Sequence, residues 1–383
     1  MVTIILGSGG SPDQYIYTIK PGGAPPGDCD YTTLNNWESG TRSNLVTQNR
    51  INIAEVMGGG NSITGNIAPS AGWTTDATRY IVIRAAAGHQ HSGVWDTNKA
   101  YMLQSANDAV VQSMGKDIHI EKMQIKTASY GLLFYMSNAG GQYVVDSNLI
   151  IQTGAYNSSP MQLGSGSVAS ATLTFKNNIV LNRGGVSTLQ ISNSSTSYVY
   201  NNTLINTSAS NYCIGGNAST ITNNNYMKSS YCYSGVGTMG VNDAASNSQG
   251  NPNGVVTANL RSIPYSTATF QNITVDSENL RPVVSGSNKL LDNGANLTGS
   301  GVTTDIIGTA RPLFGGFDIG AFENDIPICW NYTARYKNSN KLFKASGCGN
   351  FPKSLQVPSN VDTSTGKMVD DGIFISPDKY KIV

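Results

Sequence analysis

Short alternations of apolar and polar residues recur along the middle of the chain. A six-residue pattern begins at Val145, Phe175, Val199 and Ile221, and its fourth position is asparagine in every copy. The alternation predicts short strands, and the Gly, Ser or Asn residues that follow each copy predict turns. We therefore predict a strand-and-turn unit that repeats along the chain.

The length of the repeat is typical of a stacked coil. Its asparagines, Asn148, Asn178, Asn202 and Asn224, are 30, 24 and 22 residues apart. Residues 80–84 and 118–125 show the same alternation and predict two earlier strands. Strands that recur once per winding pair with those of the windings above and below, about 4.8 Å away. The pattern therefore predicts an all-β fold, a parallel β-helix or solenoid.

We assign the four repeated asparagines to a structural ladder. Asparagine tolerates left-handed backbone angles at corners, and stacked amides pass hydrogen bonds from one winding to the next. This role accounts for Asn148, Asn178, Asn202 and Asn224 without a ligand.

The chain ends differ from its centre, and we expect three parts. Residues 1–45 form an N-terminal strand and a capping helix, with Thr33 as N-cap and with Leu34 and Trp37 on one helix face. Residues 46–325 form the parallel β-helix. Residues 326–383 form a small β-rich module for attachment or oligomerisation. This module is basic, because it carries eight Lys or Arg and four Asp, a net +4.

Composition excludes several classes of protein. The 383 residues are 39% hydrophobic and only 12% charged, with a formal net charge of +1. That balance argues against disorder and gives no electrostatic reason to expect nucleic acid as a partner. No segment has the run of about 18 apolar residues that a membrane span needs, and we expect no membrane association and no signal peptide.

The cysteines predict free thiols rather than a metal site. They form no Cys-x-x-Cys pair and have no histidine at metal-binding spacing. The cysteines are Cys29, Cys213, Cys232, Cys329 and Cys348.

Two further motifs carry a resemblance to a known family. The opening Tyr31-Thr-Thr-Leu-x-x-Trp-Glu38 precedes the asparagine repeats, and Asp305-x-x-Gly-x-x-Arg-Pro312 with Asp318-Ile-Gly-Ala-x-Glu323 follows them. Together they resemble the right-handed parallel β-helix proteins of tailed-phage virions, including tailspike-like and decoration-like proteins, and of bacterial surface and polysaccharide-acting proteins. The resemblance covers about residues 30–325.

The resemblance implies a right-handed coil, a homotrimer and a structural cluster at the end of the coil. That cluster would consist of Asp305, Arg311, Asp318 and Glu323, with the guanidinium binding carboxylates. Because the family includes enzymes and non-enzymes, the resemblance does not fix an activity.

The centre of the coil offers little catalytic chemistry. Glycoside hydrolysis uses two carboxyl groups on either side of the bond, and Asp146 is the only acidic residue between Thr127 and Asn242. Weak acid–base candidates lie earlier in the chain: His89, His91, Asp117, His119 and Glu121. We predict no catalytic residue, no metal and no cofactor, and we favour a protein that is not an enzyme.

We therefore expect a structural or adhesive surface protein of a tailed-phage virion, such as a spike, a tail component or a capsid decoration. It would be made in the host cytoplasm, work on the virion surface, contact other virion proteins and form a homo-oligomer. The 19 tyrosines make surface polysaccharide of the host a candidate ligand. Two alternatives remain: a tailspike enzyme, hydrolase or lyase, that depolymerises polysaccharide, and a cellular adhesin exported without a signal peptide.

Overall fold

The computed structural model describes most of the chain before residue 325 and the strands that follow it. The described residues are 2–64, 67–69, 72–105, 108–135, 141–154, 158–163, 171–184, 186–191, 196–207, 212–217, 219–238, 240, 242–246, 262–285, 287–313, 316–324, 329–336, 341–348, 354–355, 361–370, 373–375 and 381–382.

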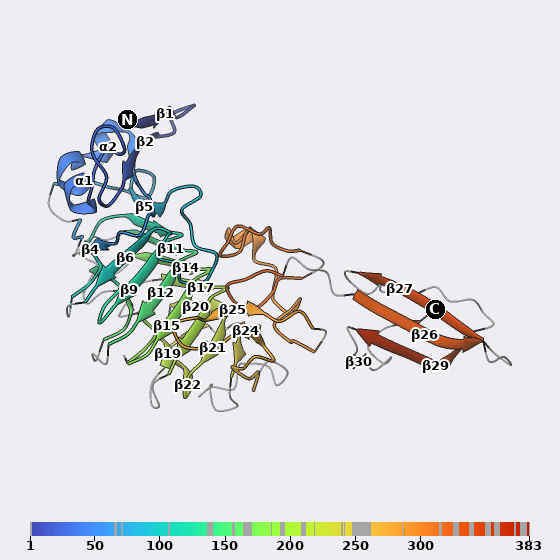
Figure 1. Cartoon of the computed structure of the whole chain (residues 1–383). Helices are drawn as coiled ribbons and strands as arrows, with labels where there is room; N and C mark the ends of the chain where they lie inside the picture. The colour runs from blue at the N-terminus through green and yellow to red at the C-terminus, as the bar shows by residue number, and fades with distance from the viewer. Residues whose placement is uncertain are drawn as a thin grey trace.

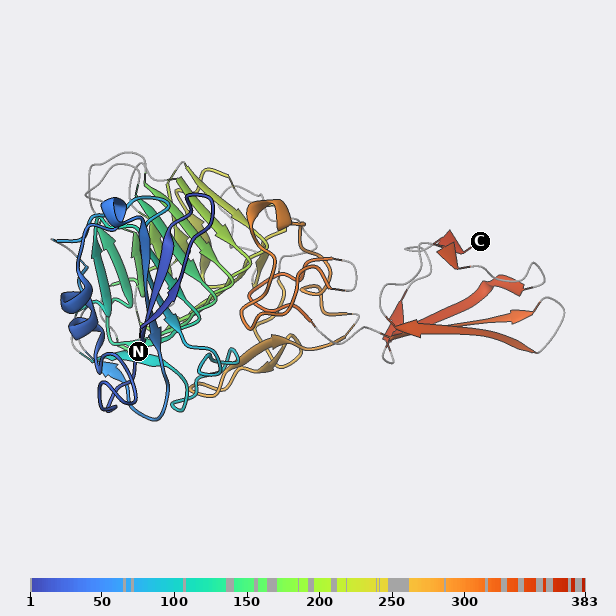
Figure 2. The ribbon, with the colours of Figure 1, turned by 90° about the horizontal axis from the view of Figure 1, so that it is seen from above.

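The fold is all-β, and its largest part consists of three sheets of mainly parallel strands (Figures 1 and 2). Sheet 1 contains β1 (Thr3–Ile5), β2 (Asp13–Ile19), β3 (Arg50–Val56), β5 (Ile81–Ala85), β8 (Ile118–Glu121), β11 (Gln142–Asp146), β14 (Thr172–Lys176), β17 (Thr196–Tyr200) and β20 (Thr220–Asn223). Sheet 2 contains β4 (Ile63–Thr64), β6 (Tyr101–Gln104), β9 (Gln124–Thr127), β12 (Leu149–Gln152), β15 (Ile179–Asn182), β18 (Thr203–Asn206), β21 (Tyr226–Lys228) and β23 (Ala244–Ala245). Sheet 3 contains β7 (Val111–Met114), β10 (Leu132–Tyr135), β13 (Met161–Leu163), β16 (Leu189–Ile191), β19 (Tyr212–Gly215) and β22 (Tyr231–Ser234).

The chain passes through the three sheets in a fixed order. From β8 to β22 it runs from sheet 1 to sheet 2 to sheet 3 and back to sheet 1, and we call one such passage a circuit. Equivalent strands of successive circuits pair in parallel and in register, as Val145 with Phe175 and Phe175 with Val199 show. The predicted repeat is therefore present as parallel pairing.

The circuits enclose one continuous hydrophobic core. In β11 and β14 buried and half-buried residues alternate, so one face of sheet 1 points inward and the other toward solvent. In β12, β15 and β18 all residues are buried, because other segments of the chain cover the outer face of sheet 2.

Each repeated pattern is a corner between two strands rather than a single strand. The chain leaves sheet 1, turns through one residue with positive φ and enters sheet 2. These turn residues are Lys122, Ser147, Asn177, Asn201 and Asn224, with φ between 52° and 60°. The segment predicted as one strand over 118–125 divides into β8 and β9 at Lys122 for the same reason.

A short helical cap lies at the N-terminal end of the stack (Figure 1). Helix α1 (Leu34–Thr41) begins as predicted, with the Thr33 hydroxyl accepting a hydrogen bond from the Asn36 N–H. Leu34 and Trp37 are fully buried on one side of this helix. Helix α2 (Leu45–Gln48) follows, and its Asn44 N-cap accepts from Thr47.

After β23 the chain runs back along the outside of the stack. This part contains β24 (Phe270–Asn272) and β25 (Asn279–Pro282), which form an antiparallel hairpin, and the 3₁₀ helix η2 (Thr298–Ser300). We call residues 316–324 the return segment. Its Gly320 N–H donates to Asn224 O, and its Ala321 N–H donates to the Thr203 hydroxyl.

The C-terminal residues form a β module, as predicted. Strands β26 (Cys329–Tyr336), β27 (Leu342–Cys348), β29 (Val361–Asp370) and β30 (Ile373–Ile375) make an antiparallel sheet, and β28 (Ser354–Leu355) pairs with β31 (Lys381–Ile382). Among the described residues no helix is long and apolar enough to cross a membrane.

Candidate functional site

A ladder of buried asparagines runs along the corner between sheets 1 and 2. The Asn148 N–H and its Nδ2 donate to Asn178 Oδ1, and Asn178 donates in the same way to Asn202, at 2.8–3.1 Å. Each amide nitrogen also donates to the strand of the preceding circuit, as Asn202 Nδ2 does to Phe175 O at 2.9 Å. The ladder therefore holds three successive corners at one spacing.

The fourth predicted ladder residue is one position too early. Asn202 donates to Asn225, not to Asn224. Asn224 is the turn residue with φ 57°, and its amide binds Asn201 Oδ1 and Ala295 O instead. The Asn–Asn step thus divides two tasks: the first residue makes the left-handed turn, and the second joins the ladder.

The ladder ends on a carboxylate that the sequence pattern does not reveal. Asp243 Oδ1 accepts from the Asn225 N–H at 2.7 Å and from its Nδ2 at 3.0 Å. Its other oxygen accepts from the hydroxyls of Thr222 and Tyr233, both at 2.5 Å. Burial raises the pKa of Asp243 above its ordinary value.

The four residues of the predicted ionic cluster lie together and are almost fully buried. Arg311 binds Glu323 at 3.0 Å and also donates to the carbonyl oxygens of Asp318 and Gly320. Asp305 accepts backbone hydrogen bonds from Ile307, Thr309 and Glu323. Burial and the nearby charge of Glu323 raise the pKa of Asp318 to about 7.

This cluster lies beside the stack, not at its end as the resemblance implied. The Asn201 side chain donates to Asp318 O at 3.0 Å, and Gly320 contacts Asn224 one circuit further on. The left-handed corners turn backbone and amide groups outward, and the return segment satisfies them. The cluster is exposed by less than 6% at every position, so no substrate reaches it.

The weak acid–base candidates do not form one site. His91 is buried beside the corner at Ser147, where its Nε2 lies 3.0 Å from Ser147 O and its Nδ1 accepts from the Gly93 N–H. Burial lowers the pKa of His91 to about 4, so its ring is neutral at pH 7. Asp117 is also buried and accepts from Thr75 and from the Gln142 N–H. His89 donates its backbone N–H to Ala86 O.

His119 and Glu121 share the outer face of sheet 1, as their alternation predicted. His119 Nδ1 lies 3.6 Å from Glu121 Oε1, and the His119 ring stacks on Tyr80 at 3.9 Å. The next charged pair along that face, Arg84 and Glu55, is 2.6 Å apart. Within the described part of the chain no three His, Cys, Asp or Glu residues are placed to hold a metal ion.

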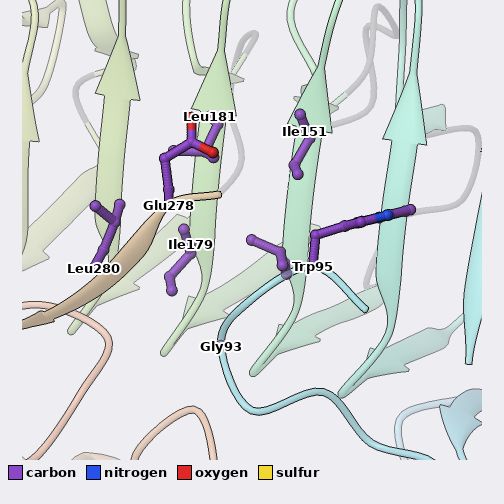
Figure 3. A pocket seen from close by; sticks show the side chains of 8 residues that line it. Gly93, Trp95, Ile151, Ile179, Leu181, Glu278 and Leu280 are labelled. Atoms are coloured by element: carbon purple, nitrogen blue, oxygen red, sulfur yellow. The ribbon is translucent and has the colours of Figure 1, made fainter. Parts of the chain in front are cut away.

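The best candidate for a binding site lies on the outer face of sheet 2 (Figure 3). Two adjoining hollows flank Glu278 there, and we call them together the outer groove. The smaller is almost filled, with about 10 Å³ of free space, and has Trp95 on one side and Leu280 on the other. Its floor is formed by four aliphatic residues of β12 and β15: Leu149, Ile151, Ile179 and Leu181.

The larger hollow, about 230 Å³, combines apolar and hydrogen-bonding groups. Its apolar lining includes Tyr265 and Val275, and the Val275 side chain is 63% exposed. The remaining lining residues come from β15 and β18, from the residue that follows each of these strands, and from the β24–β25 hairpin: Leu181, Asn182, Arg183, Ile205, Thr207, Ile273 and Glu278.

One guanidinium fixes the hairpin over the groove. Arg183 binds Asp276 and Glu278, each at 2.7 Å. Lys126 lies 3.5 Å from Asp276 and 5.6 Å from the centre of the Trp95 ring. The hydrogen bond and charge of Arg183 lower the pKa of Asp276 below its ordinary value.

This arrangement suits binding better than proton transfer. A glycosidase needs one carboxylic acid with a raised pKa, and the pKa of Asp276 is lowered instead. An aromatic ring beside hydroxyl and guanidinium groups is a usual composition of a site for a polar ligand with apolar faces.

The residues of the groove are far apart in the sequence, and sequence reasoning missed them. Arg183 and Glu278 are separated by 95 positions. The only available signal was the acidic pair Asp276 and Glu278 between two short apolar runs, which is typical of a hairpin tip.

No family model matches the chain, and neither the curated proteins nor the solved structures include a similar one.

Proposed function

We propose that the chain is a right-handed parallel β-helix that serves as a structural or adhesive surface protein of a tailed-phage virion. The observation that carries the proposal is the in-register parallel pairing of successive circuits around one filled core. Such pairing satisfies the backbone of every inner strand and produces a stiff body suited to exposure outside cells.

We further propose that the outer groove contacts a glycan of the host surface. Sugar rings present apolar faces and many hydroxyl groups; Tyr265 and Val275 offer apolar contact, and the exposed Thr207 offers a hydroxyl. The basic C-terminal module would attach the protein to other virion proteins, and copies would associate as a homo-oligomer, a trimer by the resemblance.

Antibody labelling of phage particles tests the virion role. An antibody raised against the purified chain should label intact phage particles released from cells that carry the gene. Label confined to the cell envelope would instead indicate a cellular adhesin.

A glycan array tests the groove. Tyr265→Ala and Val275→Asp should each weaken binding of host-envelope glycans by about tenfold or more, because both residues line the larger hollow. Tyr231→Ala is the matched control, since this tyrosine is 43% exposed but lies on sheet 3. Equal losses in all three variants, or no binding by the wild type, would contradict the groove.

Release of reducing sugar from the same glycans separates binding from cleavage. We expect none above that of a heat-denatured sample. Release that depends on Asp276 or Glu278 would favour the polysaccharide-depolymerising alternative.

A further inference from the structure

The first strand, β1, is an open sheet edge with an apolar surface. It pairs with β2 on one side only, and its three residues are all exposed. Among the described residues, four of the six large hydrophobic side chains that are exposed belong to this edge: Val2, Ile4, Ile5 and Leu6. Figure 1 shows β1 at the N-terminal extremity of the stack, beyond β2.

An edge of this kind binds another strand. Among the described residues no second strand pairs with its outer row of backbone N–H and C=O groups. Natural proteins usually protect such an edge with charge, proline or a covering segment. Residues 1–11 contain neither a charged residue nor a proline. The edge is therefore open to strand addition and carries no charge that would select a partner of opposite sign.

The sequence of the edge is complementary to itself. In an antiparallel pair centred on Ile4, the residue opposite Ile4 is Ile4 of the second copy, and Val2 lies opposite Leu6. Residues 2, 4 and 6 of a strand point to the same face, so the pair would place six large aliphatic side chains in one row. Two identical neutral strands also meet without repulsion.

We propose that two copies of this chain associate through β1, by antiparallel pairing about a two-fold axis at Ile4. The two copies of sheet 1 then become one continuous sheet, and the two stacks are joined at their N-terminal ends. In such a two-fold contact each copy uses its own β1 edge, so association through β1 stops at two copies.

This inference does not depend on the proposed function. It is also compatible with a trimer, because three stacks that pack side by side leave their N-terminal edges free. The association would then double the mass of the trimer instead of the mass of the single chain.

Charge substitutions at the two-fold axis test the proposal on the full chain. Ile4→Lys and Ile4→Glu should each halve the mass measured by light scattering after size-exclusion chromatography, because like charges face each other at the axis. We expect the dissociation constant to rise by about tenfold or more. An equimolar mixture of the two variants should recover the doubled mass, because lysine then faces glutamate.

The matched control is Val275→Lys, which changes another exposed aliphatic residue, on the outer groove, 63% exposed against 49% for Ile4. It should leave the mass unchanged. The proposal is wrong if the wild type and Ile4→Lys have the same mass, if the mixture does not recover the wild-type mass, or if Val275→Lys also halves it. Heterogeneous large species in the wild type would indicate unspecific aggregation and would also overturn it.

Discussion

At the residue scale, the direction of the amide ladder determines which residue type each position accepts. An internal ladder residue must both accept and donate: Asn202 accepts from Asn178, and its Nδ2 donates to two carbonyl oxygens and to Asn225. The last position only accepts, because hydroxyl donors meet the far oxygen of Asp243. Aspartate therefore fits the end of the ladder and not its interior.

Two opposite substitutions, aspartate for Asn202 inside the ladder and asparagine for Asp243 at its end, test this rule. Asn202→Asp should lower the free energy of unfolding by roughly 3–5 kcal/mol, because a buried carboxylate would face three acceptor oxygens. Asp243→Asn should cost only about 1 kcal/mol, because the hydroxyls of Thr222 and Tyr233 can rotate to accept from the new amide. Urea denaturation of both variants checks the difference, and equal costs would refute the assigned direction.

The repeated asparagines could be found in the sequence because the ladder repeats at every corner. The choice between Asn224 and Asn225 could not, since three consecutive asparagines offer three possible positions. Pairing of β20 with β17 decides it: Asn223 lies opposite Tyr200, so Asn224 takes the turn position of Asn201. The Asp243 terminus lies beyond the last repeat and leaves no trace in the pattern.

At the scale of elements, the β24–β25 hairpin depends on one arginine. The Glu278 side chain is 8% exposed, and Arg183 is the partner that compensates its charge. The Lys126 contact to Asp276 is longer, at 3.5 Å, and more exposed. A buried pair and a surface pair thus hold the same hairpin, and they should contribute very differently.

Arg183→Met should therefore release the hairpin. We expect the amides of residues 270–282 to exchange hydrogen faster, by an opening free energy lower by roughly 2–4 kcal/mol, because Glu278 would remain buried without a counter-charge. Lys126→Met is the control and should change exchange by less than about 0.5 kcal/mol. Similar exchange in both variants would show that packing alone holds the hairpin.

The elements differ in how well the sequence predicts them. The capping helix and the C-terminal strands follow from local signals, such as Thr33 at the N-cap and the short apolar run Ile373–Ile375 between Gly372 and Pro377. The outer groove does not, because it forms only when the hairpin meets strands that precede it by some 90 positions. The aliphatic outer face of β15 was visible as a continuous apolar run, but nothing in that run identifies what covers it.

At the scale of the whole molecule, the ionic cluster makes stability depend on pH. One guanidinium, Arg311, faces the three buried carboxyl groups of Asp305, Asp318 and Glu323. Burial, together with the nearby negative charge of Glu323, raises the pKa of Asp318, which keeps its proton up to a pH of about 7. The cluster joins the return segment to the corners, so its charge state acts on the whole stack.

A carboxyl group whose pKa is raised by folding favours the folded state most when it is protonated. Its contribution is complete below the unfolded pKa of about 4 and is lost as the pH rises toward 7. The stability of the wild type relative to Asp318→Asn should thus fall by about 2–4 kcal/mol between pH 4 and pH 7. Thermal or urea unfolding at several pH values measures it.

Asp276→Asn provides the control for this measurement. The pKa of Asp276 is lowered in the folded protein, so its contribution is lost only as the pH falls below the ordinary range of aspartate. The stability of the wild type relative to this variant should stay constant between pH 4 and pH 7. A parallel trend in both variants would mean that Asp318 is not the titrating group.

The register between circuits also constrains how the length of such a protein can vary. An insertion of one residue in a strand would exchange its core-facing and solvent-facing side chains and shift every neighbour. Duplication or loss of an entire circuit preserves all pairings, since each circuit presents equivalent positions to both sides. Natural variants and engineered forms should accordingly grow or shrink in steps of one circuit, each about 4.8 Å of height.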